Sequence, residues 1–303
     1  MSLGIPYMGS KRKLSGEILK FITSRHQGLT DFYDLFGGGG SVSFTAIRDY
    51  RFNVHYNELN SHIYHLVKYL QENKTLEPKF YEWVTREMFF EQTGKSNDQA
   101  DWYSGFVMSC WSFGNSQTSY LYGDEVESIK RMVHNFLIFG CLESMKQLDL
   151  NIPEVLLFDS IHKRRVIFSN HIRKLKHEHF QIENLERVKF VESMARIQNL
   201  QNLQSTNLSY EMVEIKGKNP VIYCDIPYKG TGEYKEVGFN HESFYEWARN
   251  CPHPVYISEY AAPFQEVKSF SHRSSLSATN NAKKTIEKVF WNGKGDIYKT
   301  ELF

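Results

Sequence analysis

The hydrophobic and polar positions of the first 75 residues alternate between helical and strand-like spacing. Apolar residues at helical intervals follow Ser10, and this pattern predicts a helix that Ser10 caps. The other elements predicted here are a buried strand over 32–36, a helix over 41–47, a strand over 52–56 and a helix over 61–72. Strand, glycine turn, helix and strand in this order are typical of the opening of a Rossmann-like α/β domain.

The middle of the chain, over 76–200, has a mostly helical pattern. Helices are predicted over 80–90, 102–113 and 125–148. The segment 160–177 carries six lysine and arginine residues and no acidic residue. We therefore expect a helical insertion over 76–200 that is separate from the α/β pattern around it.

The α/β pattern resumes after residue 200. The elements predicted there are a strand-like segment over 207–210, a strand over 220–225, a helix over 241–250, a strand over 254–258 and two strands over 285–291 and 297–303. Asn292-Gly293-Lys294-Gly295 lies between the last two strands and predicts a hairpin. Residues 1–75 and 201–303 are therefore expected to form one α/β domain, a Rossmann-like sheet of parallel strands with an antiparallel C-terminal hairpin.

Composition excludes several classes of protein. Of the 303 residues, 41% are hydrophobic, which is ordinary for a globular chain. No apolar run approaches the roughly 20 residues that span a bilayer. The four cysteines lie far apart without paired spacing, so we expect a reduced, cytoplasmic protein without a structural zinc site. Because the net charge is only +1, any nucleic-acid surface must be a local patch.

The glycine run after the first predicted strand is the first candidate for chemistry. Glycines at 37, 38, 39 and 40 let the backbone turn sharply and approach a ligand, because glycine has no side chain to clash. The helix that follows would offer free amides. A tight turn without a ligand fits the same residues. Glu58 ends the next strand, where an acid commonly binds ribose hydroxyls, although a solvated loop acid fits equally well.

The tetrad Asp225-Ile226-Pro227-Tyr228 is a stronger signal. Its carboxylate follows a central strand, where α/β sheets place their active sites. Pro227 restricts the direction of the Ile226 carbonyl, and Tyr228 adds a flat aromatic ring. Together they could hold a planar base by stacking while two acceptors bind its exocyclic amine. The residues alone leave one alternative open, a strand that ends in an Asp-Pro turn with a packed tyrosine.

Segments spread over nearly the whole chain resemble the Dam-type adenine-specific DNA methyltransferases, especially phage and prophage members. In the order of the family they are YMGSKRKL (7–14), DLFGGGGS (34–41) and VIYCDIPYKGTGEY (221–234), with ISEY (257–260) and the terminal ELF as weaker matches. The resemblance covers least of the helical insertion. It implies an enzyme that uses S-adenosylmethionine to methylate the N6 amine of adenine in double-stranded DNA by base flipping, with the insertion recognising the DNA. We expect this chemistry to need no metal, and we expect a monomer.

The resemblance also implies roles for individual residues. Tyr7 and Lys11 match residues that touch the cofactor, Glu58 matches the acid on its ribose, and Asp225 and Tyr228 match the catalytic aspartate and the aromatic that stacks on the flipped base. The residues expected to bind the cofactor are Tyr7, Lys11, Asp34, Phe36, Gly37, Gly38, Gly39, Glu58 and Asp225. The catalytic tetrad is Asp225, Ile226, Pro227 and Tyr228.

The DNA surface is expected in the helical insertion. Arg164, Arg165, Arg173 and Lys174 are predicted to contact phosphates, although solvated charges fit the same pattern. A polar loop over 114–119, bracketed by aromatic residues, could also reach bases, although aromatics beside a helix end often belong to a core.

Two departures from the family pattern leave alternatives open. Ile226 stands where the family usually has a proline, which keeps open a catalytically weakened protein that only binds DNA. Ser209 lies near a position where the family often has an aspartate that meets the cofactor's adenine. Methylation of the N4 amine of cytosine would use the same acceptors, but an aspartate at the first place of the tetrad favours adenine. RNA methylation is a third alternative, which the resemblance disfavours.

Overall fold

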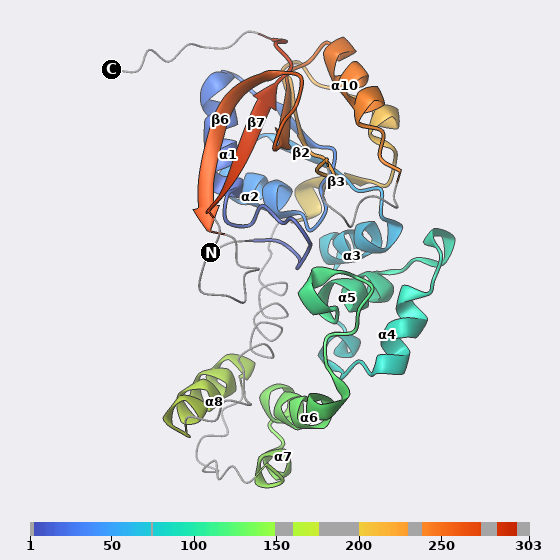
Figure 1. The fold of residues 1–303 in the computed structure, drawn as a ribbon, viewed down its shortest axis with the longest axis vertical. Coiled ribbons are helices and arrows are strands. Elements are labelled where there is room, and N and C mark those ends of the chain that lie inside the picture. Colours follow the sequence, from blue (N-terminus) through green and yellow to red (C-terminus); the bar gives the residue numbers. More distant parts are fainter. Residues whose placement is uncertain are drawn as a thin grey trace. The chain divides into compact units, whose positions relative to one another are not determined.

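The computed structural model describes residues 3–73, 75–148, 160–175, 200–229, 238–273 and 284–295 (Figure 1). The chain divides into two compact units. The first unit comprises residues 1–4, 10–64 and 199–303, and the second comprises 5–9 and 65–198. Helix α3 (Ser61–Glu72) begins in the first unit and ends in the second. No helix in these described ranges is long and apolar enough to cross a membrane.

The first unit is built on a seven-stranded mixed sheet with the strand order β3-β2-β1-β4-β5-β7-β6. Its strands are β1 (Asp31–Asp34), β2 (Asn53–Asn57), β3 (Leu203–Thr206), β4 (Pro220–Asp225), β5 (Val255–Glu259), β6 (Gln265–Arg273) and β7 (Lys284–Trp291). The first five are parallel, and β7 is antiparallel to both β5 and β6. The expected α/β class with an antiparallel C-terminal hairpin is thereby confirmed.

Helices cover both faces of this sheet (Figure 1). The helical elements of the first unit, besides the start of α3, are α1 (Ser15–Arg25), α2 (Ser41–Asp49), α10 (His241–Asn250), η5 (Leu200–Asn202) and η6 (Tyr210–Met212). Side chains alternate along each strand, so neighbouring residues serve opposite faces. Ile257 packs with Phe244 of α10, whereas the preceding Tyr256 accepts a hydrogen bond at 3.1 Å from Arg25 of α1.

The second unit is helical. Its described elements are η1 (Pro78–Tyr81), α4 (Arg86–Thr93), η2 (Asn97–Gln99), α5 (Trp102–Cys110), η3 (Phe113–Asn115), α6 (Asp124–Phe139), α7 (Leu142–Lys146) and α8 (Ile161–Leu175). Asp101 caps α5 by accepting a hydrogen bond from the Ser104 amide at 2.7 Å. Phe136 of α6, Met145 of α7 and Phe168 of α8 meet in one apolar core.

Local backbone chemistry shifts several predicted helix boundaries. The first helix begins at Ser15 and has Leu14 at its N-cap, so Ser10 does not cap it. The carbonyl of Lys11 closes the preceding turn by accepting from the Leu14 and Ser15 amides. The helix predicted over 125–148 ends at Gly140, whose φ of 72° is the left-handed conformation that favours glycine. The helix predicted over 80–90 is divided into η1 and α4.

The sheet corrects the predicted hairpin pairing and one predicted strand-like segment. The partner of β7 in the hairpin is β6, which precedes it in the sequence, and the other edge of β7 is paired with β5. Both edges of β7 are therefore occupied, and the strand predicted over 297–303 lies outside the described residues. The strand-like segment predicted over 207–210 is also wrong, because the edge strand is β3 and Tyr210 begins a short 3-10 helix.

Candidate active site

Three acidic residues stand at the carboxyl ends of adjacent parallel strands. Asp34 ends β1, Glu58 follows β2 and Asp225 ends β4. Strand β1 lies between β2 and β4, where the order of the strands reverses. Ligands of open α/β sheets bind at this kind of switch point, outside the carboxyl ends of the strands.

The glycine loop is shaped by its contacts with β2. The Gly37 amide donates to the Asn57 carbonyl at 2.8 Å, and the Tyr56 hydroxyl donates to the Gly38 carbonyl at 2.8 Å. A Cβ atom on Gly37 would lie 2.2 Å from the Tyr56 ring, closer than atoms can approach. Gly40 stands at the N-cap of α2 with φ of 70°. Glycine is required at these positions by packing and backbone conformation.

Glu58 is tied to the glycine loop. Its carboxylate accepts hydrogen bonds from the Gly38 amide at 2.7 Å and from the Asn60 amide at 2.8 Å. Burial raises the pKa of Glu58, and the two amides act in the opposite direction. An ionised carboxylate has about four acceptor sites, so the two amides leave capacity for further donors.

Asp34 and Phe36 lie on either side of the turn that follows β1. The Ser43 hydroxyl donates to the Asp34 carboxylate at 2.7 Å. Burial raises the pKa of Asp34 to about 7, and the hydrogen bond from Ser43 opposes this rise. The Phe36 ring packs against Tyr210 and Phe244, with ring centres 5.5 and 5.6 Å away.

Asp225 forms a buried ion pair with Lys11. The lysine ammonium lies 2.7 Å from Asp225 Oδ1, and only 6% of the lysine side chain is exposed. Burial raises the pKa of Asp225 to about 6, and the positive charge of Lys11 limits this rise. Burial lowers the pKa of Lys11, but the carboxylates of Asp225 and Glu287 outweigh it and hold that pKa above its ordinary value.

Tyr228 is held by groups on three sides. Its hydroxyl donates a hydrogen bond to Glu287 of β7, and the Lys11 ammonium lies over its ring, 4.8 Å from the centre. Tyr260 meets the ring edge-on at 4.7 Å and 80°. Burial raises the pKa of Tyr228 well above its ordinary value, so the phenol keeps its proton.

The backbone between Asp225 and Tyr228 is fixed from both faces. The Ile226 side chain is 2% exposed and belongs to the apolar cluster beneath α10. His241 Nε2 lies 2.8 Å from the Pro227 carbonyl, to which it donates. The Lys229 amide donates to the buried Glu259 at 3.1 Å. Among the described residues no hydrogen bond reaches the Ile226 carbonyl, which leaves an acceptor beside Asp225.

Some of the predicted residues belong to the second unit. Tyr7 belongs to segment 5–9 of the second unit. Arg164 is 8% exposed, and its guanidinium donates to the Leu137 and Ile138 carbonyls at 2.7 and 2.6 Å. This inward orientation contradicts its predicted phosphate contact, because the guanidinium satisfies the C-terminal carbonyls of α6. Arg165 is half-buried on the same helix, while the side chains of Arg173 and Lys174 lie outside the described part of α8.

The polar loop after α5 has a defined shape. Ser112 and Tyr120 form an isolated antiparallel bridge, and the Phe113 amide donates to the Ser119 carbonyl at 2.8 Å. Asn115 and Gln117 both have positive φ, at 60° and 66°. Such values are uncommon for residues other than glycine and concentrate at functional sites. Phe113 is 65% exposed, so this aromatic is not part of a core.

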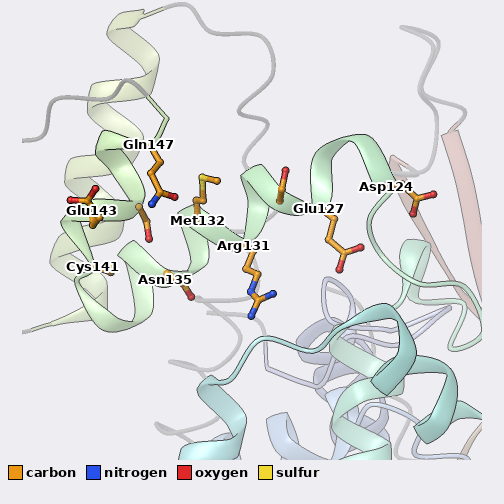
Figure 2. Close-up of a pocket in the computed structure, with 10 residues that line it drawn as sticks. Asp124, Glu127, Arg131, Met132, Asn135, Cys141, Glu143 and Gln147 are labelled. Atoms are coloured by element: carbon orange, nitrogen blue, oxygen red, sulfur yellow. The ribbon is translucent and has the colours of Figure 1, made fainter.

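An open groove of about 580 Å³ runs along α6 and α7 (Figure 2). Asp124, Glu127 and Glu143 line it together with Arg131. None of the predicted site residues is among its lining residues. Its acidic balance is also unfavourable for phosphate contacts, which need basic side chains.

Sequence reasoning missed several groups of the cluster, and Glu287 is the most important. The sequence contained a clue to it. Glu287 lies two and four residues before the apolar Val289 and Trp291, so the three share one face of a strand, and a carboxylate on a buried face is unusual. Ser43 stands where a third glycine would come in a dinucleotide motif, and its bond to Asp34 gives a reason for serine there. The role of His241 depends on its distance from the tetrad and had no signal in the sequence. Glu259 lies within the ISEY segment (257–260), for which no single-residue role was predicted.

Comparison with models of known protein families gives a match over most of the chain. A family model described as D12 class N6 adenine-specific DNA methyltransferase matches residues 7–291, a range that includes all the side chains of the site. No curated protein matches the chain.

Proposed function

The chain belongs to the D12 class N6 adenine-specific DNA methyltransferase family, and on that premise we propose that it transfers a methyl group from S-adenosylmethionine to an adenine flipped out of double-stranded DNA. The single observation that carries the proposal is the ion-paired Asp225 at the end of β4, with an unengaged carbonyl and an aromatic ring beside it. Membership of an adenine-specific family sets aside the alternative of cytosine methylation.

The residues at the carboxyl ends of β1 and β2 fit S-adenosylmethionine. Glu58, with acceptor sites left over from its two amide bonds, suits the ribose hydroxyls. The glycine loop and the first turn of α2 suit the methionine end, with Asp34 close by. The Ser10 hydroxyl is buried and, among the described residues, has no hydrogen-bond partner, so it can accept or donate to a ligand. When bound, the cofactor supplies an electrophilic methyl group.

The tetrad residues are suited to hold the adenine. A base stacked in a duplex cannot be reached, so it is flipped out at a cost of a few kcal/mol. Tyr228 stacks on the flipped base. The Asp225 carboxylate and the Ile226 carbonyl accept the two hydrogens of the amine, which leaves the nitrogen lone pair free for attack. Both acceptors also stabilise the positive charge that develops on nitrogen, and fixed geometry supplies much of the acceleration.

The packing of Ile226 supports an active enzyme rather than a protein that only binds DNA. Its side chain fills the apolar cluster beneath α10, so isoleucine serves the core while its carbonyl remains beside Asp225. The chemistry needs only that carbonyl. Pro227 still restricts the backbone at Ile226, and His241 holds the Pro227 carbonyl.

We further propose that the second unit recognises DNA. Of the four basic residues predicted to contact phosphates, the structure describes the side chains of Arg164 and Arg165. Arg164 is turned inward, and Arg165 on α8 is half-buried. The loop over 113–119 is a second contact, because it combines amide and hydroxyl side chains with an exposed phenylalanine. Amide side chains read base edges, and apolar side chains can be inserted between base steps.

One experiment tests the proposed function. The protein is incubated with S-adenosylmethionine carrying a deuterated methyl group and, in separate reactions, with DNA duplexes of varied sequence or with RNA. The nucleosides of each reaction are then analysed by mass. Labelled N6-methyl-2′-deoxyadenosine from the DNA is the expected product. Label only on cytosine, only in RNA, or in neither would overturn the proposal. The Asp225→Ala protein is the control, since it should lose methyl transfer severely while its affinity for the cofactor falls less.

A further inference from the structure

Glu287 is a buried carboxylate in the middle of a strand. It is 4% exposed and lies on the same face of β7 as Val289 and Trp291, which are buried too. A carboxylate taken out of water destabilises the fold unless partners compensate its charge. Its contacts therefore explain why it stands there.

Both partners of Glu287 belong to the proposed catalytic cluster. The Tyr228 hydroxyl donates to Glu287 Oε1. The Lys11 ammonium lies 3.5 Å from the same oxygen and 2.7 Å from Asp225 Oδ1. The ammonium thus lies between two carboxylates, nearer to Asp225, and over the ring of Tyr228.

Binding of the target base changes what these groups must do. The adenine amine has to donate to Asp225, where the ammonium already occupies an acceptor position. The base also has to stack on Tyr228, over whose ring the ammonium lies. A lysine that gave up Asp225 without another anion would be left as an uncompensated charge in a buried place, at high cost. Glu287 is that other anion, and it is already within ion-pair distance.

We propose that Glu287 is a positioning residue for methyl transfer, which holds the Tyr228 ring through its hydroxyl and takes over the Lys11 ammonium when the target amine binds Asp225. This inference rests on the proposed roles of Asp225 and Tyr228. Glu287 itself touches neither the base nor the cofactor.

The variant Glu287→Gln isolates the charge of this residue. Its amide oxygen can still accept from Tyr228, and Lys11 keeps Asp225 as its counter-ion, so no buried charge is left unpaired. The matched control is Glu266→Gln, on neighbouring β6, where the carboxylate is partly exposed and pairs with Lys288. Glu287→Asp keeps the negative charge on a side chain that is shorter by one methylene group, and it serves as the conservative variant.

Three readouts separate positioning from a merely structural role. We expect Glu287→Gln to lower the single-turnover rate at saturating DNA at least tenfold, while the Kd for S-adenosylmethionine changes less than threefold. We expect Glu287→Asp to recover part of the rate. The third readout is the acid limb of kcat/KM against pH, which reports essential groups of the free enzyme.

The direction of the pH shift is fixed by charge. The negative charge of Glu287 raises the pKa of Asp225, so its removal should move the acid limb to lower pH, by about half a unit or more. The other titratable groups around Asp225 are Lys11, Asp34, Tyr223, Cys224 and Tyr228, and all of them remain in the variant. A loss of folded protein would lower the rate at every pH without moving the limb.

The outcomes distinguish the inference from the proposed function. If the natural protein methylates adenine and Glu287→Gln matches it in rate and in the position of the limb, the inference is wrong and the function stands. If the natural protein transfers no methyl group, both are wrong. If Glu287→Gln does not melt cooperatively, Glu287→Asp becomes the deciding variant. The inference is then overturned if Glu287→Asp has the rate of the natural protein and the same acid limb of kcat/KM.

Discussion

The ammonium of Lys11 lies 2.7 Å from a carboxylate oxygen of Asp225, inside a cluster where burial raises the pKa of the acid and the lysine charge opposes that rise. The pKa of Asp225 is raised to about 6, so the group is mostly ionised at neutral pH. A protonated acid has fewer acceptor sites to offer an amine. The lysine therefore sets the pH range in which the proposed chemistry can run.

Replacing Lys11 should move the acid limb of activity upward. In Lys11→Met the counter-charge is gone, and the Asp225 pKa should rise by about 1 unit or more, since a nearby cation lowers an aspartate pKa by roughly 1–3. Activity should then be weak at pH 7 and recover as the pH rises. Profiles of kcat/KM against pH at saturating cofactor measure this. Lys13→Met, at an exposed position two residues away, should leave the profile unchanged; a coincident profile for Lys11→Met would contradict the prediction.

Glu58→Gln should weaken the binding of S-adenosylmethionine and spare DNA binding. Hydrogen bonds to charged groups contribute about 1.5–3 kcal/mol, so we expect a Kd increase of roughly 10- to 150-fold. Titration calorimetry with the cofactor and a DNA-binding assay give the two affinities. Glu17→Gln, on the exposed side of α1, is the control and should bind the cofactor normally. An unchanged Kd for Glu58→Gln would place the ribose elsewhere.

Gly37→Ala and Gly16→Ala should have opposite effects on stability. A Cβ atom on Gly37 would overlap the Tyr56 ring at 2.2 Å, so the ring has to move, and we expect a loss of about 1–3 kcal/mol. Gly16 lies in α1 with no heavy atom within 4 Å of the new Cβ, so alanine should add about 0.5–1 kcal/mol. Denaturant unfolding measures the free energy of unfolding of both variants. If Gly37→Ala is as stable as the natural protein or more so, the Tyr56 ring moves aside without cost and the prediction is wrong.

Arg164 and Arg165 should separate stability from DNA binding. Arg164→Ala removes a buried guanidinium from the Leu137 and Ile138 carbonyls and should lower the free energy of unfolding by about 2–3 kcal/mol. Arg165→Ala should leave stability within about 0.5 kcal/mol but weaken DNA binding alike for all sequences, with a salt slope shallower by about one unit. If affinity and slope are unchanged, the phosphate contacts lie elsewhere, and the loop over 113–119 is tested next.

Ile226→Pro should slow methyl transfer little and destabilise the fold. Proline supplies the same main-chain carbonyl, so the rate should stay within about tenfold, or roughly 1.4 kcal/mol of barrier. The smaller side chain leaves space in the cluster beneath α10, which should lower stability by about 1–2 kcal/mol. Single-turnover kinetics and unfolding curves test the two parts. If the natural protein is inert on adenine-containing duplexes and Ile226→Pro restores methyl transfer, the natural protein is one that only binds DNA.

The elements that the sequence predicted well are those with strong local periodicity. The predictions over 61–72, 220–225 and 241–250 coincide with α3, β4 and α10. Strand β6 was not predicted because it is an edge strand, whose many exposed positions leave no clean alternation. The hairpin was paired with the wrong segment because a turn signal describes four residues, whereas the partners of β7 are chosen by the whole sheet.

The candidate site shows the same division. Glu58 and Asp225 were predicted because each follows a predicted strand, where α/β sheets place their ligands. Asp34 was predicted only because the segment DLFGGGGS resembles the cofactor loop of the family. Glu287 was not, because its approach to Tyr228 depends on the long-range pairing of β7 with β5. The orientation of Arg164 could have been predicted, since it precedes the buried Phe168 by four residues and so shares its helix face.

The parallel pairing of β2 with β3 joins Val54 to Leu203, and this has a consequence for how the chain can change in evolution and fold. Everything between these strands is a loop whose two ends the sheet holds side by side. The entropy of closing a loop grows only with the logarithm of its length, so doubling the segment would cost about 0.6 kcal/mol. The helical unit can therefore grow, shrink or be exchanged while the sheet keeps its register. The same pairing raises the contact order of the fold, because the long intervening segment has to close as a loop before the contacts between β2 and β3 can form.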